Sequence, residues 1–318
     1  MKRFKLHLVI FLMALASIAP FVALDAETGH EQPQEILKPS VSAPAESGFK
    51  MAATETSLKP PAAVSQGAAP SSAAAARNAA LRDELDWTFG GKKQRGWRIY
   101  EPLIARLIGT EHDAASAEFA SALSRWQKSA GLGANGVLDG ASLSAMVSRW
   151  QGARLKERGY PNPDQLLTAP PADFYDPGRA EDLRQVERET YAAYKRMVAA
   201  ATQDPALRLK TNGAGELAPG EKYLKIISSF RSREYQEKLR REQPNAGRAA
   251  LAVGNSPHFT GRALDLYVGG EPVETKDSNR ALQVQTPAYR WLVRNAERFG
   301  FRPYYYEPWH WEYVSASK

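Results

Sequence analysis

The chain has 318 residues, enough for two domains with extensions, and its 43% hydrophobic and 24% charged residues are ordinary for a soluble globular protein. It contains no cysteine, so disulfides, thiolate catalysis and cysteine-ligated zinc are excluded, and any metal site must use His, Asp or Glu. The net charge of +7 favours contact with an anionic surface, or is simply solvated, and no basic run with interleaved aromatic residues points to nucleic acid.

The N-terminal residues follow the pattern of a secretory signal. A basic start at residues 2–5 (KRFK) precedes an apolar run over residues 6–24, and small residues offer several cleavage points. We expect residues 1–24 to be a cleaved signal peptide. An uncleaved membrane anchor is the alternative, because the apolar run is nearly long enough to span a bilayer. In both cases the rest of the chain is expected to be extracytoplasmic.

Residues 25–77 are rich in Ala, Pro, Ser and Glu and have no sustained periodicity, which predicts a disordered linker. Within it, SGFK (47–50) matches the S-x-x-K pattern of serine penicillin-binding enzymes. That pattern needs a helix in a folded domain and a K-T-G partner, but Lys210-Thr211 is followed by Asn212. We therefore interpret the match as chance.

Residues 78–155 are predicted to form a small all-α domain. The segment 118–132 carries apolar side chains at helical spacing, and Asp139 is placed to cap a second helix. Three features of this region resemble the three-helix peptidoglycan-binding domain attached to many wall hydrolases: the Trp-Gln pair, the Gly-Leu that follows it and the turn GVLDGASL (136–143). Ser142 stands where that family usually has Thr. The resemblance implies peptidoglycan binding, and a generic helical spacer is the alternative.

The next segment, residues 156–175, contains four prolines and is predicted to be a second linker. After it the pattern changes to mixed helix and strand, which predicts an α+β domain over residues 176–318 that folds alone, with an antiparallel sheet and flanking helices. The predicted helices cover 180–202, 232–242 and 286–300, and the predicted strands lie within 222–230, 261–268 and 303–314.

One histidine of this domain lies in the segment SPHFTGRALD (256–265). His258 is expected in a loop and Asp265 on the strand that follows. On that strand Leu264 and Leu266 share one face and Asp265 points to the other. A carboxylate flanked by apolar residues on a buried strand needs a partner, and a metal ion is a good one.

The domain's other histidine lies in EPWHWE (307–312). Glu307 precedes His310 by three residues, so Pro308 must break the strand if both side chains are to reach one site. Two His and one Asp supply three zinc ligands and leave a fourth position for water, and Glu307 is then free to act as general base. Glu312 is expected on the strand face of His310, either as its hydrogen-bond partner or in an ordinary ion pair.

Together, SPHFTGRALD and EPWHWE resemble the VanY-type D-alanyl-D-alanine carboxypeptidases, in the larger group that includes lysostaphin-type and hedgehog-like proteins. That family's pattern is S-x-H-x-x-G-x-A-x-D followed by E-x-W-H. The resemblance implies one zinc ion per chain, held by His258, Asp265 and His310, with Glu307 as the catalytic base.

A further segment, SFRSREYQ (229–236), resembles the family's S-x-Y-R-S-x-x-x-Q pattern, with Phe230 in place of Tyr. By that resemblance Arg231 is a catalytic residue that stabilises the tetrahedral oxyanion. The residues that it assigns to substrate binding are Ser232, Gln236 and Ser256.

The predicted function is that of a zinc-dependent carboxypeptidase, located in the periplasm or at the cell wall, that removes the terminal D-alanine from peptidoglycan stem peptides. An L,D-carboxypeptidase or a peptidoglycan endopeptidase would use the same metal core, and these alternatives stay open. A non-catalytic wall-binding protein is a further alternative, whereas a serine D,D-peptidase depends on residues 47–50 alone. The oligomeric state is left open.

Overall fold

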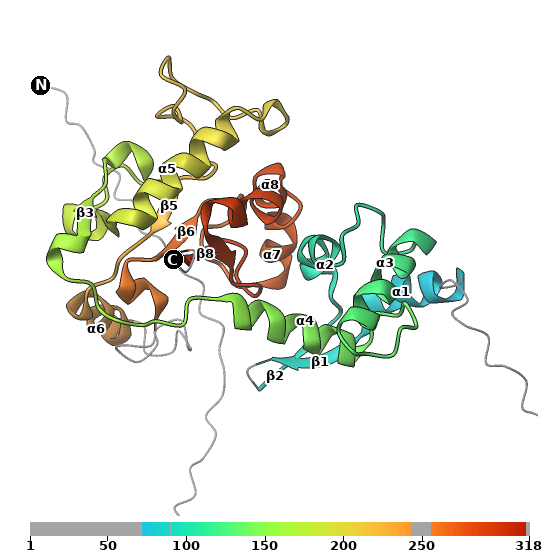
Figure 1. Cartoon of the computed structure of the whole chain (residues 1–318). Helices are drawn as coiled ribbons and strands as arrows, with labels where there is room; N and C mark the ends of the chain where they lie inside the picture. The colour runs from blue at the N-terminus through green and yellow to red at the C-terminus, as the bar shows by residue number, and fades with distance from the viewer. Residues whose placement is uncertain (1–71, 90, 243–255, 316–318) are drawn as a thin grey trace, which may run out of the picture. The chain divides into compact units, whose positions relative to one another are not determined.

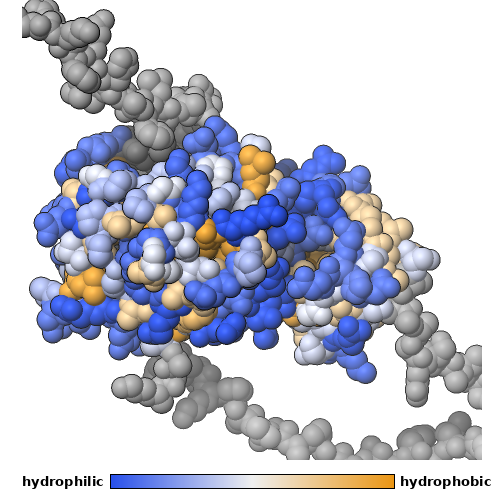
Figure 2. Space-filling view, turned by 90° about the horizontal axis from the view of Figure 1, so that it is seen from above, coloured by the Kyte–Doolittle hydropathy of each residue, from blue (hydrophilic) through white to orange (hydrophobic). Residues whose placement is uncertain are grey.

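The computed structural model describes residues 72–89, 91–242 and 256–315. The predicted signal peptide (1–24), nearly all of the first predicted linker and the SGFK segment lie outside these residues. Among the residues described, no helix combines the length and the apolar character needed to cross a membrane. The face seen in Figure 2 is largely hydrophilic, with small, scattered hydrophobic spots. The large apolar side chains that the described residues expose are Tyr160, Val273 and Leu282.

Four α-helices and a β-hairpin make up the first part of the described chain, and Figure 1 shows their arrangement. They are α1 (Ser72–Glu84), β1 (Asp86–Phe89), β2 (Lys92–Arg95), α2 (Glu101–Ile108), α3 (Ala117–Ser129) and α4 (Gly140–Ala153). The Asp139 carboxylate accepts a hydrogen bond from the Ser142 N–H, which confirms the predicted helix cap. The antiparallel pair β1–β2 was not predicted, so the expectation of an all-α region is incomplete.

The turn between α3 and α4 is held by two buried amides. Gln127 Nε2 donates to Ser142 Oγ (2.9 Å), and its Oε1 accepts from the Gly136 N–H (2.8 Å). Asn78 on α1 donates to the Gly136 carbonyl and accepts from the Leu138 N–H, both at 2.8 Å. Gln127 and Ser142, which belong to the motif that resembles a wall-binding domain, therefore have a structural role in this turn.

The second part of the described chain is built on a four-stranded sheet in the order β5-β6-β8-β7, with every neighbouring pair antiparallel. The strands are β5 (Ile226–Ser228), β6 (Ala263–Leu266), β7 (Phe301–Pro303) and β8 (His310–Tyr313). The accompanying helices are α5 (Arg188–Thr202), α6 (Arg233–Glu242), α7 (Asp277–Gln283) and α8 (Pro287–Asn295). The mixture of helices and a small antiparallel sheet agrees with the predicted α+β class.

Two boundaries differ from the sequence prediction, and both involve a second small sheet. Strand β3 (Leu166–Thr168) pairs antiparallel with β4 (Gln185–Glu187). The helix expected from residue 180 therefore starts at Arg188, where the Glu187 carboxylate accepts from the first backbone N–H groups. The segment predicted as a second linker contains β3, and its backbone forms part of this sheet.

The register of the central strands decides which side chains share a face. Asp265 of β6 lies opposite His310 of β8, and Leu264 lies opposite Trp311. Because side chains alternate along a strand, Leu264 and Trp311 point to the buried side, where Trp311 contacts the Tyr289 ring of α8. Asp265 and His310 therefore lie side by side on the other face of the sheet.

Candidate active site

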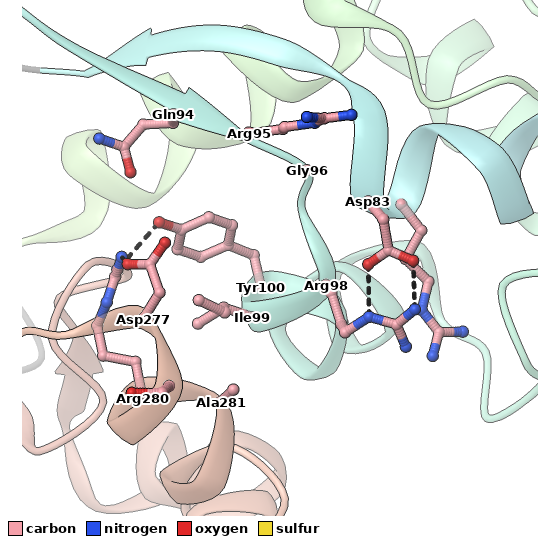
Figure 3. Close-up of a pocket in the computed structure, with 12 residues that line it drawn as sticks. Asp83, Gln94, Arg95, Gly96, Arg98, Ile99, Tyr100, Asp277, Arg280 and Ala281 are labelled. Carbon is pink, nitrogen blue, oxygen red and sulfur yellow. Dashed lines mark hydrogen bonds and ion pairs between the residues drawn. The ribbon is translucent and has the colours of Figure 1, made fainter.

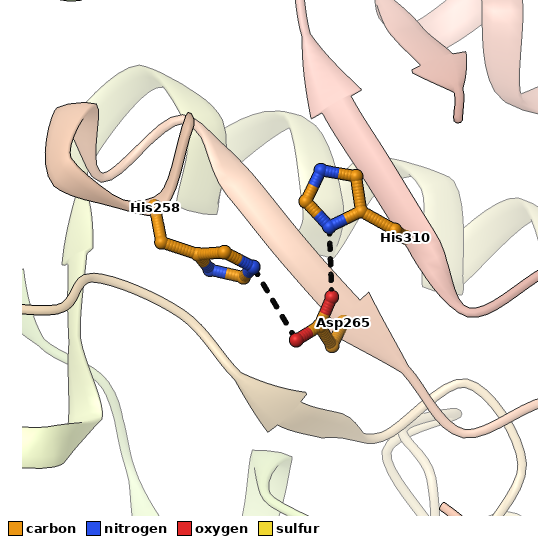
Figure 4. A group of neighbouring side chains, drawn as sticks. All are labelled: His258, Asp265 and His310. Carbon is orange, nitrogen blue, oxygen red and sulfur yellow. Dashed lines mark hydrogen bonds and ion pairs between the residues drawn. The ribbon is translucent and has the colours of Figure 1, made fainter. Parts of the chain in front are cut away.

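Three side chains from separate elements meet on this face of the sheet. His258 comes from the short 3-10 helix η7 (Pro257–Thr260), Asp265 from β6 and His310 from the start of β8. All three are buried, and one ligand atom from each lies within 4.8 Å of the others. His310 Nδ1 is 2.9 Å from Asp265 Oδ1, and His258 Nε2 is 3.3 Å from Asp265 Oδ2 (Figure 4). The residues predicted to be metal ligands are thus brought together.

Outer hydrogen bonds orient both imidazole rings. His258 Nδ1 lies 2.7 Å from the Ser229 carbonyl oxygen, which assigns the proton to Nδ1 and leaves Nε2 directed at Asp265. His310 Nε2 lies 3.3 Å from Glu312 Oε1, which leaves Nδ1 directed at Asp265. This arrangement, with one ring nitrogen bonded outward and the other facing a shared point, is typical of metal-ligating histidines.

Electrostatics favour an ionised aspartate between the two rings. Burial opposes a charge on Asp265, but the contacts with His258 and His310 hold its pKa well below the usual range. Burial, together with the Arg231 charge, lowers the pKa of His258 to about 4, so its ring is neutral. Burial also opposes a charge on His310, yet hydrogen bonds to Asp265 and Glu312 raise its pKa to about 9.

The donor set fits zinc. Two imidazole nitrogens and a carboxylate are ligands that zinc prefers, and three protein ligands are the usual number at a catalytic zinc site. The three groups are buried, and both imidazole rings are already oriented by Ser229 and Glu312, which contact the ring nitrogens that face away from Asp265. Within the described ranges, this is the group of His, Asp and Glu side chains with spacing suitable for a metal ion.

The loop before β6 requires a glycine at position 261. Its φ of +68° lies in the left-handed region, and a Cβ there would be 3.0 Å from the backbone nitrogen of Glu187. The Gly261 N–H donates to the His258 carbonyl, and its own carbonyl accepts from the Glu187 N–H, both at 3.2 Å. The glycine thus closes η7 and ties the His258 loop to β4.

Glu307 lies in the tight turn that leads into β8. Its N–H donates to the Tyr304 carbonyl (3.0 Å), and its carbonyl accepts from the His310 N–H (2.9 Å). Burial raises the pKa of its carboxyl; the Asp265 charge adds to this effect, and the charges of His310 and Arg231 oppose it. The carboxyl therefore lies within electrostatic reach of Asp265 and His310 without being one of the clustered ligand groups.

Arg231 lies directly beside Asp265. Its Nη2 donates to Asp265 Oδ2 (3.0 Å), its Nε donates to Ser228 Oγ (3.1 Å), and its backbone N–H donates to the His258 carbonyl (3.2 Å). The guanidinium thus lies next to Asp265, and its predicted contact with the substrate stays a prediction. It also has a partner that sequence reasoning did not assign, because it helps to hold the Asp265 carboxylate.

The three residues assigned to substrate binding differ in their surroundings. Ser232 Oγ accepts from the Tyr235 N–H at the start of α6, and Ser256 Oγ accepts from the His258 N–H, so both serines cap helices. Gln236 is fully buried, and neither polar atom of its amide finds a hydrogen-bond partner among the described residues. Of the three, Gln236 is the one whose amide atoms have no partner within the described residues.

Glu312 makes both of the contacts that the sequence left as alternatives. It lies next to His310 Nε2 and forms an ion pair with Arg154. Arg154 was not identified from the sequence. It follows the last turn of α4, 158 positions before Glu312, and no local pattern connects the two residues.

Two of the pockets formed by described residues are lined by side chains other than the three clustered residues. One, of about 300 Å³, is lined by charged residues, among them the Asp83–Arg98 ion pair, and here Arg280 Nη1 donates to the Tyr100 hydroxyl (3.1 Å; Figure 3). The other, of about 610 Å³, is lined by residues that include Thr260. Neither lining includes His258, Asp265 or His310.

Comparisons with known proteins identify the part of the chain that carries the site. Residues 183–316 match the family model VanY, described as D-alanyl-D-alanine carboxypeptidase. No curated protein matches the chain. The matched residues include the three clustered side chains, Glu307 and Arg231, whereas Arg154 and the whole of α1–α4 lie outside the match.

Proposed function

Residues 183–316 form a VanY-family domain, and from this premise we propose that the protein is a zinc-dependent carboxypeptidase that removes the terminal D-alanine from peptidoglycan stem peptides. The observation that carries the proposal is the buried group of His258, Asp265 and His310, with both imidazole rings oriented by outer hydrogen bonds. Neutral His258 and ionised Asp265 are in the protonation states that metal ligation needs, whereas His310, with its pKa raised to about 9, releases a proton when a metal binds.

One zinc ion per chain would be held by His258 Nε2, His310 Nδ1 and an oxygen of Asp265. Zinc, when bound, supplies the Lewis acidity that makes water a nucleophile at neutral pH. Burial of the ligands keeps bulk water away from them, which strengthens every charge interaction inside the site.

Glu307 is proposed as the general base and later the general acid. Its carboxylate takes a proton from the attacking water and then delivers a proton to the amine of the departing D-alanine. Both duties require a pKa between that of an ordinary carboxyl and neutrality, and burial moves the pKa of Glu307 upward in that direction.

Arg231 is proposed to stabilise the negative charge that develops on the scissile carbonyl oxygen. A guanidinium that is already fixed by Ser228 and Asp265 needs little reorganisation to donate to this oxygen in the transition state. Its planar set of N–H groups can hold Asp265 and still present a donor to the substrate.

Gln236, Ser232 and Ser256 are proposed to bind the substrate. The case is best for Gln236, because leaving a buried amide unpaired costs about 1–3 kcal/mol, and a peptide or carboxylate group of the substrate would satisfy it. The two serines already accept backbone hydrogen bonds, so their hydroxyl protons remain available for donation to the substrate.

The location of the protein completes the proposal. The basic and apolar start of the chain supports export by residues 1–24, and the substrate lies outside the cytoplasm. Residues 78–155 are proposed to hold the catalytic domain near peptidoglycan, on the strength of the Trp-Gln and GVLDGASL motifs.

The deciding experiment is product analysis by mass spectrometry on defined pentapeptide and tetrapeptide muropeptides. We expect loss of one D-alanine from the pentapeptide, loss of this activity with a chelator and its return with zinc. Cleavage of the tetrapeptide instead would indicate an L,D-carboxypeptidase, and cleavage of cross-linked dimers an endopeptidase. Chelator-resistant activity that penicillin blocks would indicate a serine enzyme, and no product from any substrate would indicate a non-catalytic wall-binding protein.

A further inference from the structure

The end of α4 packs directly on the segment that carries Glu307 and His310. The ring of Trp150 stacks on that of Tyr305, with their centroids 5.8 Å apart. One turn later, the guanidinium carbon of Arg154 lies 4.0 Å from the centre of the Tyr304 ring. This contact brings the first part of the described chain to the strand that begins with His310.

At this contact Glu312 receives hydrogen bonds from two sides. Arg154 donates to its Oε1 through both Nε (3.1 Å) and Nη2, and the Leu155 N–H donates to its Oε2 (2.9 Å). On the other side His310 Nε2 lies 3.3 Å from the same Oε1. The Glu312 side chain is 0% exposed, so these partners replace the water that a carboxylate would otherwise have.

A buried carboxylate is stable only while its partners remain in place. Burial opposes the charge of Glu312, and the contacts with Arg154, the Leu155 N–H and His310 Nε2 offset that cost. Removal of Arg154 would leave a buried negative charge short of partners. A second arginine, Arg158, has its Nη1 3.8 Å from Oε1, which is too far for a hydrogen bond.

We propose that Arg154 and the Leu155 N–H position the metal centre by holding Glu312 against His310 Nε2, so that His310 Nδ1 stays directed at Asp265. The inference rests on the proposed function, because His310 is a metal ligand only if the protein binds zinc as proposed above. Arg154 touches neither His310 nor Asp265 in the contacts described, and it acts through Glu312. The end of α4 then belongs to the catalytic machinery, although it lies outside the residues that match the family.

The test uses the full chain and three arginine variants. Arg154→Met removes the charge and both donors but keeps a long side chain over Tyr304. Arg154→Lys keeps the charge without the planar pair of donors. Arg149→Met removes an exposed arginine of the same helix and is the matched control. The measurements are the zinc dissociation constant, by competition with a chromophoric chelator, and the visible absorption spectrum after cobalt substitution.

We expect Arg154→Met to weaken zinc binding by about 10–100-fold, the usual effect of losing a group that orients a metal ligand, and to change the cobalt spectrum. Arg154→Lys should restore part of the affinity, and Arg149→Met should match the wild type. An Arg154→Met protein with wild-type zinc affinity and cobalt spectrum would overturn the inference.

If Arg154→Met does not fold, Glu312→Gln is the deciding variant, because it keeps the size of the side chain but removes its charge and one of its two acceptor oxygens. It should weaken zinc binding as well, and an unchanged affinity would overturn the inference. A wild-type protein that binds no zinc would instead refute the proposed function, and this inference with it. If instead the wild type binds zinc and the variants bind it equally well, only this inference is refuted and the proposed function stands.

Discussion

Nδ1 of His310 lies 2.9 Å from Oδ1 of Asp265, although the two residues are 45 positions apart in the chain. The contact exists because β6 and β8 pair antiparallel with these two residues opposite each other. A slip of one residue in this pairing would turn one of the two side chains to the other face of the sheet. The geometry of the site therefore depends on strand register.

Metal content is the first prediction. Purified protein should hold about one zinc per chain, as a site with three protein ligands implies. His310→Ala should lose most of it, because two ligands remain. Atomic absorption after removal of loosely bound metal measures both proteins. A His310→Ala protein that keeps a full equivalent of zinc would exclude His310 as a ligand.

Glu307→Gln should separate catalysis from metal binding. The variant should retain zinc, because Glu307 is not among the clustered ligand atoms, but kcat should fall by about 10²–10⁴-fold without the proton carrier. The readouts are zinc content and D-alanine release from a pentapeptide. Normal turnover would show that another group carries the proton.

Arg231 should affect the transition state more than substrate binding. We expect Arg231→Ala to lower kcat by about 10²–10³-fold, the usual effect of removing one oxyanion donor, and Arg231→Lys to restore only part of it. Zinc content must be measured as well, because Arg231 also donates to Asp265 Oδ2. If kcat is unchanged and KM rises, Arg231 serves ground-state binding.

Gly261→Ala should destabilise the loop that carries His258. A φ of +68° and a Cβ 3.0 Å from the Glu187 backbone predict a loss of about 1–3 kcal/mol in the free energy of unfolding. Urea denaturation measures it. Gly220→Ala, at a position where a Cβ would meet nothing within 4 Å, is the control and should change stability little. Equal stability of the two variants would mean that the loop adjusts freely.

A truncated protein tests whether the residues before position 172 are needed for catalysis, a point on which the sequence and the structure give different predictions. The sequence alone predicts that a fragment starting near residue 172 cleaves small peptides as well as the full chain. The structure predicts a clear loss of activity, since this fragment lacks Arg154, the Leu155 N–H and β3, the strand partner of β4. Kinetics on a soluble pentapeptide, with circular dichroism to monitor folding, give the answer. Equal activity would show that the α4 contact is dispensable.

Much of the candidate site could be predicted because its signals are local. His258 and Asp265 lie within one short segment, Glu307 and His310 within another, and the alternation of Leu264, Asp265 and Leu266 predicts which face each residue takes. The role of Asp139 as a helix cap was predictable for the same reason.

The features that escaped prediction depend on long-range contacts or on weak local patterns. Strand β2 consists of charged and polar residues (KKQR) and has no apolar alternation, so pairing with β1 is its main sign of strand structure. Strand β4 interrupts what looks like one long helix, because its backbone pairs with β3. Arg154 meets Glu312 only after two parts of the fold come together, and the sequence shows nothing of that meeting.

The strand order β5-β6-β8-β7 has a consequence for biosynthesis. Strand β8 is the last strand of the described chain, yet it lies between β6 and β7, which the ribosome makes earlier. It carries His310, while His258 and Asp265 are already in place on earlier elements. A nascent polypeptide therefore remains without its full set of ligand groups until β8 has inserted. A chain released before His310 would lack one of the three proposed ligands, and we expect it to be inactive.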